Sequence, residues 1–108
     1  MITDIEVHAL EAYPEECVGY VANGTYHRMV NVSNVPTKQY QLSPKDKMKL
    51  FSLGKNLTAL VHSHPILDNR PSGKDLAAQK ATGFAFWIIG TDGTQITKLW
   101  RSNNEDAN

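Results

Sequence analysis

Residues 57–75 read LTALVHSHPILDNRPSGKD, and this stretch predicts a strand, a loop and the start of a helix in succession. Its first part is rich in Leu and Val, which predicts a strand at residues 57–62. Pro65 begins the loop, and Ser72 is a suitable N-cap for a helix that runs to about Thr82. We therefore expect this part of the chain to connect a sheet to a helix beside it.

The residues before this stretch predict a helix and then a hairpin. Residues 3–13 carry apolar side chains at helical spacing, so we expect a first helix there. Residues 17–22 and 25–32 predict two strands. The dipeptide Asn23-Gly24 between them favours a two-residue hairpin turn, because both residues tolerate a positive φ.

A second helix is expected after a loop at residues 33–42, in which there is room for a short strand. Ser43 is followed by proline, which is typical of a helix start, and Gly54 can end the helix. We expect one apolar side on this helix, formed by Met48, Leu50, Phe51 and Leu53.

The C-terminal part predicts two further strands and a polar tail. Residues 84–89 are nearly all apolar, which is typical of a strand covered on both faces. Residues 94–101 predict a last strand, whereas residues 102–108 are too polar to pack and are expected to be disordered. The chain is therefore expected to form one domain, residues 1–101. The element order α-β-β-α-β-α-β-β predicts the α/β (mixed α+β) class, with a single mixed sheet flanked by helices.

The composition restricts the class of protein. The chain has 108 residues with eleven basic and eleven acidic side chains, so its formal net charge is zero and a nucleic acid is not expected as the main partner. No apolar run approaches the roughly 20 residues that span a bilayer, and the N-terminus lacks a signal-peptide pattern, so we expect a cytoplasmic protein with no membrane partner. The single cysteine, Cys17, excludes an internal disulfide framework and a zinc site with several cysteines in one chain. The chemistry must therefore rest on histidine, carboxylate and hydroxyl groups.

Three side chains fall at the spacing of a metal site. His62 and His64 are two residues apart at the end of a predicted strand, and strand alternation places both imidazoles on one face. Asp75 follows after ten intervening residues, in the first turn of the next helix, and the loop is long enough to fold that turn back over the strand end. Two histidines and one carboxylate leave a fourth tetrahedral position open, which is typical of a catalytic zinc site. We therefore expect one Zn²⁺ per chain.

Each of these residues, taken alone, has a simpler interpretation. A histidine at the end of a buried strand is more often a core residue, and Ser72 with Asp75 is a common helix start. The combination favours a metal site, because independent caps and core residues rarely fall at ligand spacing. His8 and His27 have no partner at such spacing.

Hydrolysis at such a site also needs a base that takes a proton from the bound water. Glu16, beside the first predicted strand, is a candidate. Spacing alone does not favour Glu16 over its neighbour Glu15.

Together these residues resemble the signature of the JAMM, or MPN-plus, metallopeptidase family, whose domain is also called JAB. That signature is a glutamate on the first strand, followed by His-x-His, ten residues and Asp, with a Ser three residues before the Asp. The matching residues are Glu16, His62, Ser63, His64, Pro65, Ser72 and Asp75.

Within this family, the bacterial and phage branch is the most similar. There, a helix with His-Ala leads to Pro-x-Glu-x-x-Gly, and this chain has His8-Ala9 followed by PEECVG at residues 14–19. This register makes Glu16, rather than Glu15, the family glutamate. In that branch, tail assembly proteins similar to the K protein of phage lambda carry such a domain, often fused to an NlpC-type cell-wall peptidase domain.

The resemblance implies roles for five residues. His62, His64 and Asp75 would hold zinc, with a water in the open position. Glu16 would act as general base and pass the proton to the leaving amine. Ser72 would donate a hydrogen bond to the oxyanion. The implied reaction is the hydrolysis of an amide or isopeptide bond in a protein or peptide substrate.

Two alternatives stay open. One is a non-catalytic tail-assembly or scaffold module with a structural or vestigial metal site; the intact Glu16 argues against it, because such a site needs no base. The other is a protease for ubiquitin or ubiquitin-like tails, but 108 residues leave little room for the insertions that such relatives use. The partners expected in the phage branch are a tail protein or a separate NlpC-type peptidase.

Overall fold

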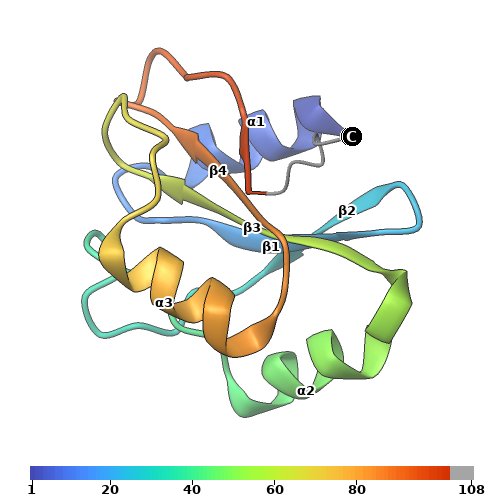
Figure 1. Ribbon diagram of the computed structural model, residues 1–108. Helices are drawn as coiled ribbons and strands as arrows, with labels where there is room; N and C mark the ends of the chain where they lie inside the picture. The colour runs from blue at the N-terminus through green and yellow to red at the C-terminus, as the bar shows by residue number, and fades with distance from the viewer. Residues whose placement is uncertain (103–108) are drawn as a thin grey trace.

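A mixed β-sheet lies at the centre of the protein, with helices on both of its faces (Figure 1). The computed structural model describes residues 1–102, and within that range the sheet has five strands in the order β2-β1-β3-β4-β5. Strands β3 and β4 run parallel, and the other neighbouring strands run antiparallel. The strands are β1 (Val18–Ala22), β2 (Thr25–Met29), β3 (Leu57–His64), β4 (Phe86–Gly90) and β5 (Trp100–Arg101).

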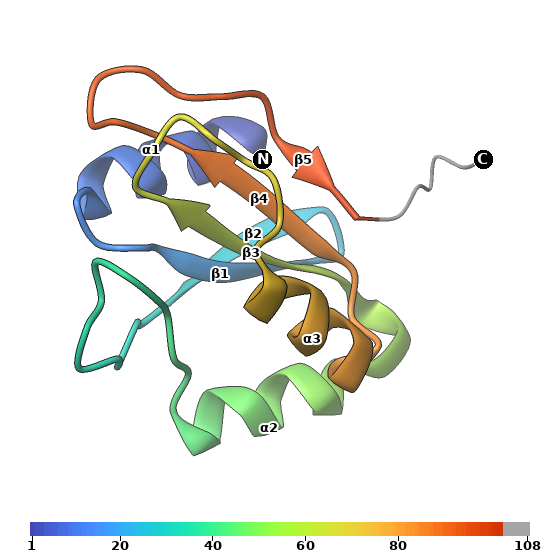
Figure 2. The ribbon, with the colours of Figure 1, turned by 60° about the vertical axis from the view of Figure 1, so that its left-hand side comes forward.

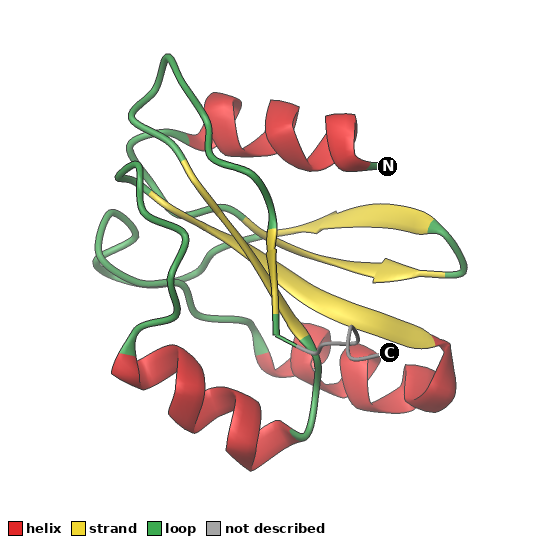
Figure 3. Cartoon of the chain, turned by 45° about the horizontal axis from the view of Figure 1, so that its top comes forward, coloured by secondary structure: helices red, strands yellow, loops and turns green. Residues whose placement is uncertain are grey.

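The helices form a layer on each side of this sheet. Helix α1 (Ile2–Ala12) covers one face, whereas α2 (Pro44–Leu53) and α3 (Gly73–Thr82) lie on the other, as Figure 2 and Figure 3 show. A short 3-10 helix, η1 (Gly54–Asn56), links α2 to β3. The predicted element order and fold class are confirmed.

Each face of the sheet has its own apolar core. The core beneath α1 consists of Ile5, Ala9, Cys17, Val21, Tyr26, Ala59, Val61, Trp87 and Ile89. The core that faces α2 and α3 consists of Val18, Tyr20, Ala22, Met29, Leu42, Leu50, Leu60 and Phe86. Residues of β3 therefore alternate between the two cores, as the period of a strand requires. His62 and His64 follow Leu60 at this period, so both imidazoles lie on the face of α2 and α3.

Local sequence signals set several element ends as predicted. The Oγ atom of Ser43 caps α2 by accepting a hydrogen bond of 3.1 Å from the Asp46 N–H. Asn23 and Gly24 have φ values of 54° and 77°, which the tight turn between β1 and β2 requires. Gly83 ends α3 with a φ of 75°, in the left-handed region.

The predicted apolar side of α2 is correct for Leu50 and Leu53 but wrong for Met48 and Phe51. Leu50 is only 2% exposed, but Met48 is 73% and Phe51 is 60% exposed. Successive helical residues are about 100° apart, so residues 48 and 50 cannot share a face. Only the side of α2 that carries Leu50 and the partly buried Leu53 reaches the sheet.

The predicted last strand is wrong over most of its length, because only Trp100 and Arg101 pair with β4. The carboxylate of Asp92 accepts hydrogen bonds from the N–H groups of Thr94 and Gln95, at 2.9 and 2.8 Å. A side chain that bonds to nearby backbone in this way competes with strand pairing. One isolated bridge, at Ile96, is formed in the turn region.

The other strands differ from the prediction only at their ends. Strand β2 stops at Met29 instead of residue 32, and β3 continues to His64 instead of ending at residue 62. Residues 33–42, all of which the structure describes, form a loop without a strand.

Ser102, which we expected to belong to the tail, exchanges two hydrogen bonds of 2.9 Å with the backbone of Phe86. The rest of the expected tail, residues 103–108, lies outside the described residues. Within residues 1–102, every helix is too short or too polar to serve as a membrane span.

Candidate metal centre

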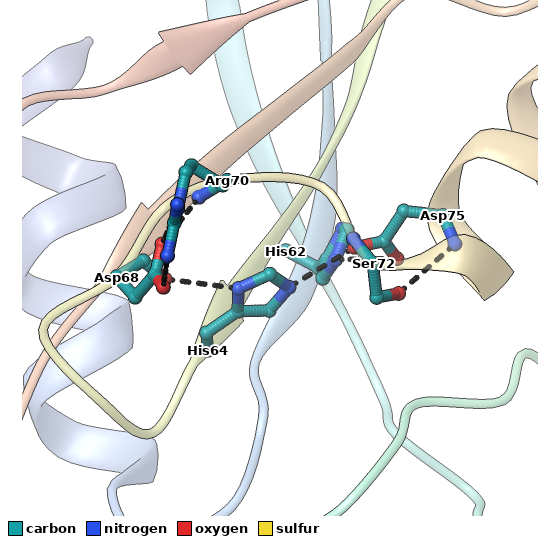
Figure 4. A network of polar contacts seen from close by, with 6 residues as sticks. All are labelled: His62, His64, Asp68, Arg70, Ser72 and Asp75. Carbon is teal, nitrogen blue, oxygen red and sulfur yellow. Dashed lines mark hydrogen bonds and ion pairs between the residues drawn. The ribbon is translucent and has the colours of Figure 1, made fainter.

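His62, His64 and Asp75 meet at one end of the sheet, as the sequence predicts. The two histidines lie at the C-terminal end of β3, where His64 pairs with Gly90 of the parallel strand β4. Asp75 is the third residue of α3, which follows the loop after β3. Because α3 begins beside the end of β3, the loop returns the carboxylate to the imidazoles (Figure 4).

The three side chains form a tight cluster. The Nε2 atom of His62 lies 3.1 Å from Oδ1 of Asp75, and the Nε2 atom of His64 lies 3.1 Å from Oδ2. One ligand atom from each of the three residues lies within 4.8 Å of the other two. These residues could therefore hold a metal ion, with both imidazoles presented through Nε2.

The hydrogen bonding of His62 fits such an ion. The residue is fully buried, and within residues 1–102 neither ring nitrogen makes a hydrogen bond of acceptable geometry, although Nε2 is close to Asp75. Buried polar atoms without partners are uncommon in folded proteins. A metal ion between Nε2 and the carboxylate would supply the missing interaction.

The tautomer of His64 is set by the backbone. Its Nδ1 atom lies 3.0 Å from the carbonyl oxygen of Asp68, which can only accept, so Nδ1 carries a proton. The lone pair of Nε2 is then available on the side of Asp75, which is the usual arrangement for a histidine ligand. The side chain of Asp68 is in turn held by Arg70, with an ion pair of 2.8 Å.

The charges of the cluster suit a cation. Burial lowers the pKa of His62 and so favours its neutral form. Burial also opposes ionisation of Asp75, but the close contacts with the imidazoles of His62 and His64 outweigh it and hold the pKa of this carboxyl well below its usual range. For His64, burial lowers the pKa, but contacts with Asp75 and the Asp68 carbonyl outweigh it, so the pKa is raised. Binding of a metal ion requires the neutral form of His64, with the proton on Nδ1 and the lone pair on Nε2.

Asp75 has a second role as part of the helix start. Its Oδ2 atom accepts a hydrogen bond of 2.9 Å from the Ser72 N–H, and Oγ of Ser72 accepts one of 3.1 Å from the Asp75 N–H. This pair is a capping box, which fixes the orientation of the carboxylate. Ser72 uses a lone pair of its hydroxyl for the cap, so its O–H proton stays available for another acceptor.

Glu16 lies just before β1 and is held in place through its backbone. Its N–H donates to the carbonyl of Pro36 at 2.8 Å, and its carbonyl accepts from Nδ2 of Asn31 at 3.0 Å. The N–H of the next residue, Cys17, donates to Oγ of Ser63 at 2.8 Å. Ser63 stands between the two histidines, so these contacts fix the backbone of Glu16 relative to the metal centre.

The carboxyl group of Glu16 has the properties of an acid–base group. It is buried, and burial raises its pKa to about 7; Asp75 also raises this pKa, whereas His64 and Lys74 lower it. Glu16, His64, Ser72 and Asp75 all line one cleft. Glu15 is exposed and does not line that cleft, so the geometry favours Glu16 over its neighbour.

Several residues around the centre were missed by the sequence analysis. The amide of Asn31 donates to the carbonyls of Glu16 and Gln39 and accepts from the N–H groups of Ser33 and Gln41. We had placed Asn31 inside a strand, where asparagine is uncommon, and this mismatch was the available signal. The contact to the Asp68 carbonyl has no sequence signal, because any residue carries that group.

The other two histidines lie away from the centre. His8 forms a hydrogen bond of 2.7 Å with the Tyr26 hydroxyl beneath α1, and His27 stacks on Tyr20 with ring centroids 4.8 Å apart. Neither belongs to a group that could hold a metal within the described residues. Cys17 is buried in the core beneath α1.

Known proteins are similar to this chain in sequence and in fold. Residues 1–103 match the family described as prokaryotic homologs of the JAB domain. Tail tip assembly protein K of Escherichia phage N15 is 37% identical over 92 residues, which are 82% of this chain but only 37% of that protein. The chain thus spans little more than a third of the length of this relative.

Solved structures agree with the family match. A protein from Desulfitobacterium hafniense superposes with a TM-score of 0.64 at 20% identity, over 93% of this chain and 75% of that one. A JAB1/MPN domain protein from Archaeoglobus fulgidus gives a TM-score of 0.54 at 20% identity, over 92% and 81%. A protein from Salinibacter ruber gives 0.54 at 27% identity, over 92% and 74%. The sequence match and the fold together show that this chain belongs to the prokaryotic JAB domain family.

Proposed function

We propose that this chain is a zinc-dependent metallopeptidase of the JAMM type, which hydrolyses an amide or isopeptide bond. The observation that carries the proposal is the cluster of His62, His64 and Asp75 at a cleft that His64, Asp75 and a buried Glu16 line. Two imidazoles and one carboxylate with an open position suit zinc. A purely structural site would have no use for a buried carboxyl group beside it.

Zinc, when bound, would supply a Lewis acid and lower the pKa of a water molecule to about 7. Glu16 would accept a proton from that water and release it to the leaving amine. Burial raises the pKa of the Glu16 carboxyl, which makes it a stronger base than an exposed carboxylate. Ser72 would donate its O–H proton to the substrate oxygen that becomes negative, while its lone pair still caps α3.

The test compares Glu16→Gln with Glu15→Gln, which changes the exposed neighbour in the same way. Zinc content is measured in both variants, and hydrolysis is followed by mass spectrometry on two probes. These probes are a Lys-C digest of a bacterial lysate and a branched peptide with a glycyl-lysine isopeptide bond. We expect about one zinc per chain in all three proteins and hydrolysis by the wild type and Glu15→Gln only. A folded protein that binds no metal, or a Glu16→Gln variant that cleaves at the wild-type rate, would overturn the proposal.

A second candidate function is a non-catalytic role in tail assembly, and the similarity to tail tip assembly protein K favours it. In a phage context, the partner would be a tail protein or a separate NlpC-type peptidase, in the host cytoplasm or the tail. Assembly of tails by a phage with Glu16→Gln distinguishes the two functions. Normal infectious particles would support the scaffold role, whereas an uncleaved tail protein with failed assembly would support the peptidase.

A further inference from the structure

A cleft of about 910 Å³ extends from the metal centre between α2 and α3. Glu16, His64, Ser72 and Asp75 line one end of it, whereas the fully buried His62 does not line it. The accessible side of the ligand cluster therefore faces this cleft. The cleft is therefore a route from solvent to the cluster.

The part of the cleft away from the metal centre is apolar. Leu60 and Phe86 of the sheet and Leu50 of α2 lie at its base, where each is at most 4% exposed. Near the C-terminal end of α3, Phe51 and Phe84 contact each other with ring centroids 4.9 Å apart and also line the cleft. Such a surface favours a large apolar side chain, because its burial removes apolar area from water.

The rim of the cleft is positively charged. Three lysines line it: Lys38 from the loop before α2, Lys47 from α2 and Lys74 from α3. Among the described lining residues, the carboxylates are Glu16 and Asp75, and both belong to the metal centre. Lys74 donates a hydrogen bond of 2.6 Å to Oε1 of Gln39, and no ion pair is formed by any of the three lysines within residues 1–102.

We propose that the cleft binds an extended peptide segment with a bulky apolar side chain next to acidic side chains. The apolar side chain packs on Phe51 and Phe84, and the acidic side chains pair with Lys38 and Lys47. This inference rests on the proposed function, which makes that segment part of the substrate beside the scissile bond. Charge complementarity at the rim is the reason to assign an acidic peptide rather than a basic one.

Two matched pairs of variants test the assignment. Lys47→Glu reverses a charge that lines the cleft, and Lys49→Glu reverses a neighbouring charge on α2 that does not. Ala78→Phe fills the cleft from α3, whereas Ala77→Phe adds the same ring to an exposed position outside it. All four changes are made in the zinc-loaded Glu16→Gln protein, so that binding is measured without turnover.

The probes are three blocked hexapeptides. The first has a central phenylalanine flanked by aspartates, the second replaces the aspartates with lysines, and the third replaces the phenylalanine with glycine. Affinity is measured by NMR titration of the ¹⁵N-labelled protein. We expect the first peptide to bind at least ten times more tightly than the other two. Lys47→Glu should weaken it about three- to fivefold, as expected for a surface charge pair, and Ala78→Phe at least tenfold.

Equal affinity for the aspartate and lysine peptides would overturn the inference. So would equal losses in Lys47→Glu and Lys49→Glu, or no binding of the first peptide at millimolar concentration. If Ala78→Phe does not fold, the comparison of Lys47→Glu with Lys49→Glu still tests the inference. Incubation of the same peptides with the zinc-loaded wild type separates this inference from the proposed function. Preferential binding by a protein that cleaves neither these peptides nor the lysate digest nor the branched peptide would overturn the peptidase and support the cleft assignment. Cleavage without binding preference would do the reverse.

Discussion

The hydroxyl of Ser63 accepts a hydrogen bond of 2.8 Å from the backbone N–H of Cys17. The N–H of Ser63 donates in turn to the carbonyl of Cys17 at 3.1 Å. Ser63 separates the two histidines of the metal centre, and Cys17 follows Glu16 in the chain. The middle residue of the His-Ser-His motif therefore connects the strand that carries both histidines to the segment that carries Glu16.

Ser63→Ala should destabilise the protein by about 1–3 kcal/mol, because the buried N–H of Cys17 loses its acceptor. Thr58→Ala, at an exposed position of β3, is the control and should change the free energy of unfolding by less than about 0.5 kcal/mol. Urea unfolding measures both variants. Amide hydrogen exchange should also be faster at Cys17 in Ser63→Ala. Equal stability of the two variants would contradict this prediction.

Ser72→Ala should affect both stability and hydrolysis, whereas Ser43→Ala should affect stability alone. Each serine caps a helix with its Oγ atom at 3.1 Å from a backbone N–H, so each loss should cost about 1 kcal/mol. Only Ser72 lines the cleft of the metal centre, so its loss should also slow hydrolysis about 100- to 1000-fold. Urea unfolding and the mass-spectrometric assay measure the two effects. Equal hydrolysis rates in the two variants would show that Ser72 is a cap only.

Zinc should stabilise the folded protein against unfolding. An ion that binds only the folded state at 100 times its dissociation constant adds about 2.7 kcal/mol. His62→Ala should abolish this gain, whereas His27→Ala, at an exposed position of β2, should retain it. Thermal unfolding with zinc and with a chelator measures the difference. The same zinc-dependent shift in both variants would place the ion elsewhere.

Gly90 is not one of the expected metal ligands, but Gly90→Ala should still weaken metal binding. A Cβ atom on Gly90 would lie 2.5 Å from the carbonyl oxygen of Ile66 and 2.8 Å from the N atom of Asp68. The loop would have to shift, and its Asp68 carbonyl orients His64. We expect zinc affinity to fall about 10- to 100-fold, as for other lost supports of a histidine ligand. Competition with a chromophoric chelator measures the affinity.

The control for this change is Gly73→Ala at the start of α3, where an added Cβ atom meets no other atom within 4 Å. Its zinc affinity should equal that of the wild type. An unchanged affinity in Gly90→Ala would mean that the loop adapts without moving the Asp68 carbonyl.

His8 should make stability depend on pH. Burial, followed by the charge of Arg28, lowers the pKa of His8 from 6.5 to about 4 in the folded protein. Between these values the unfolded chain binds the proton and the folded chain does not, so stability falls as the pH decreases from 6.5 towards 4. His8→Gln removes this contribution. The stability difference between wild type and variant, measured by urea unfolding with a chelator present, should be larger at pH 7 than at pH 4.5. An identical difference at both pH values would contradict the assignment.

The sequence was sufficient for the parts of the site that follow local rules. Strand alternation places His62 and His64 on one face, and the cap preference of Ser72 places Asp75 in the first helical turn. These rules act over a few residues, so they do not depend on the rest of the fold. The choice of Glu16 over Glu15 needed the family resemblance, because both residues precede the strand.

Contacts between distant segments could not be predicted. Asn31 reaches the carbonyl of Glu16 from 15 residues away, and no pattern in the sequence indicates that pairing. The last strand failed for a local reason, since the Asp92 side chain takes the N–H groups that a strand would pair. Phe51 is expected on the apolar side of its helix from its apolar character alone, but its angular position leaves it 60% exposed.

The carboxylate of Asp75 both starts α3 and faces the two imidazoles. Folding of this helix and occupancy of the metal centre are therefore thermodynamically linked, and the linkage is reciprocal. An ion that fixes the carboxylate also reduces fraying at the first turn of α3, which forms one wall of the cleft. Substitutions that strengthen the helix far from the ligands will in turn increase affinity for the ion. Metal supply can thus determine how well ordered this wall of the cleft is.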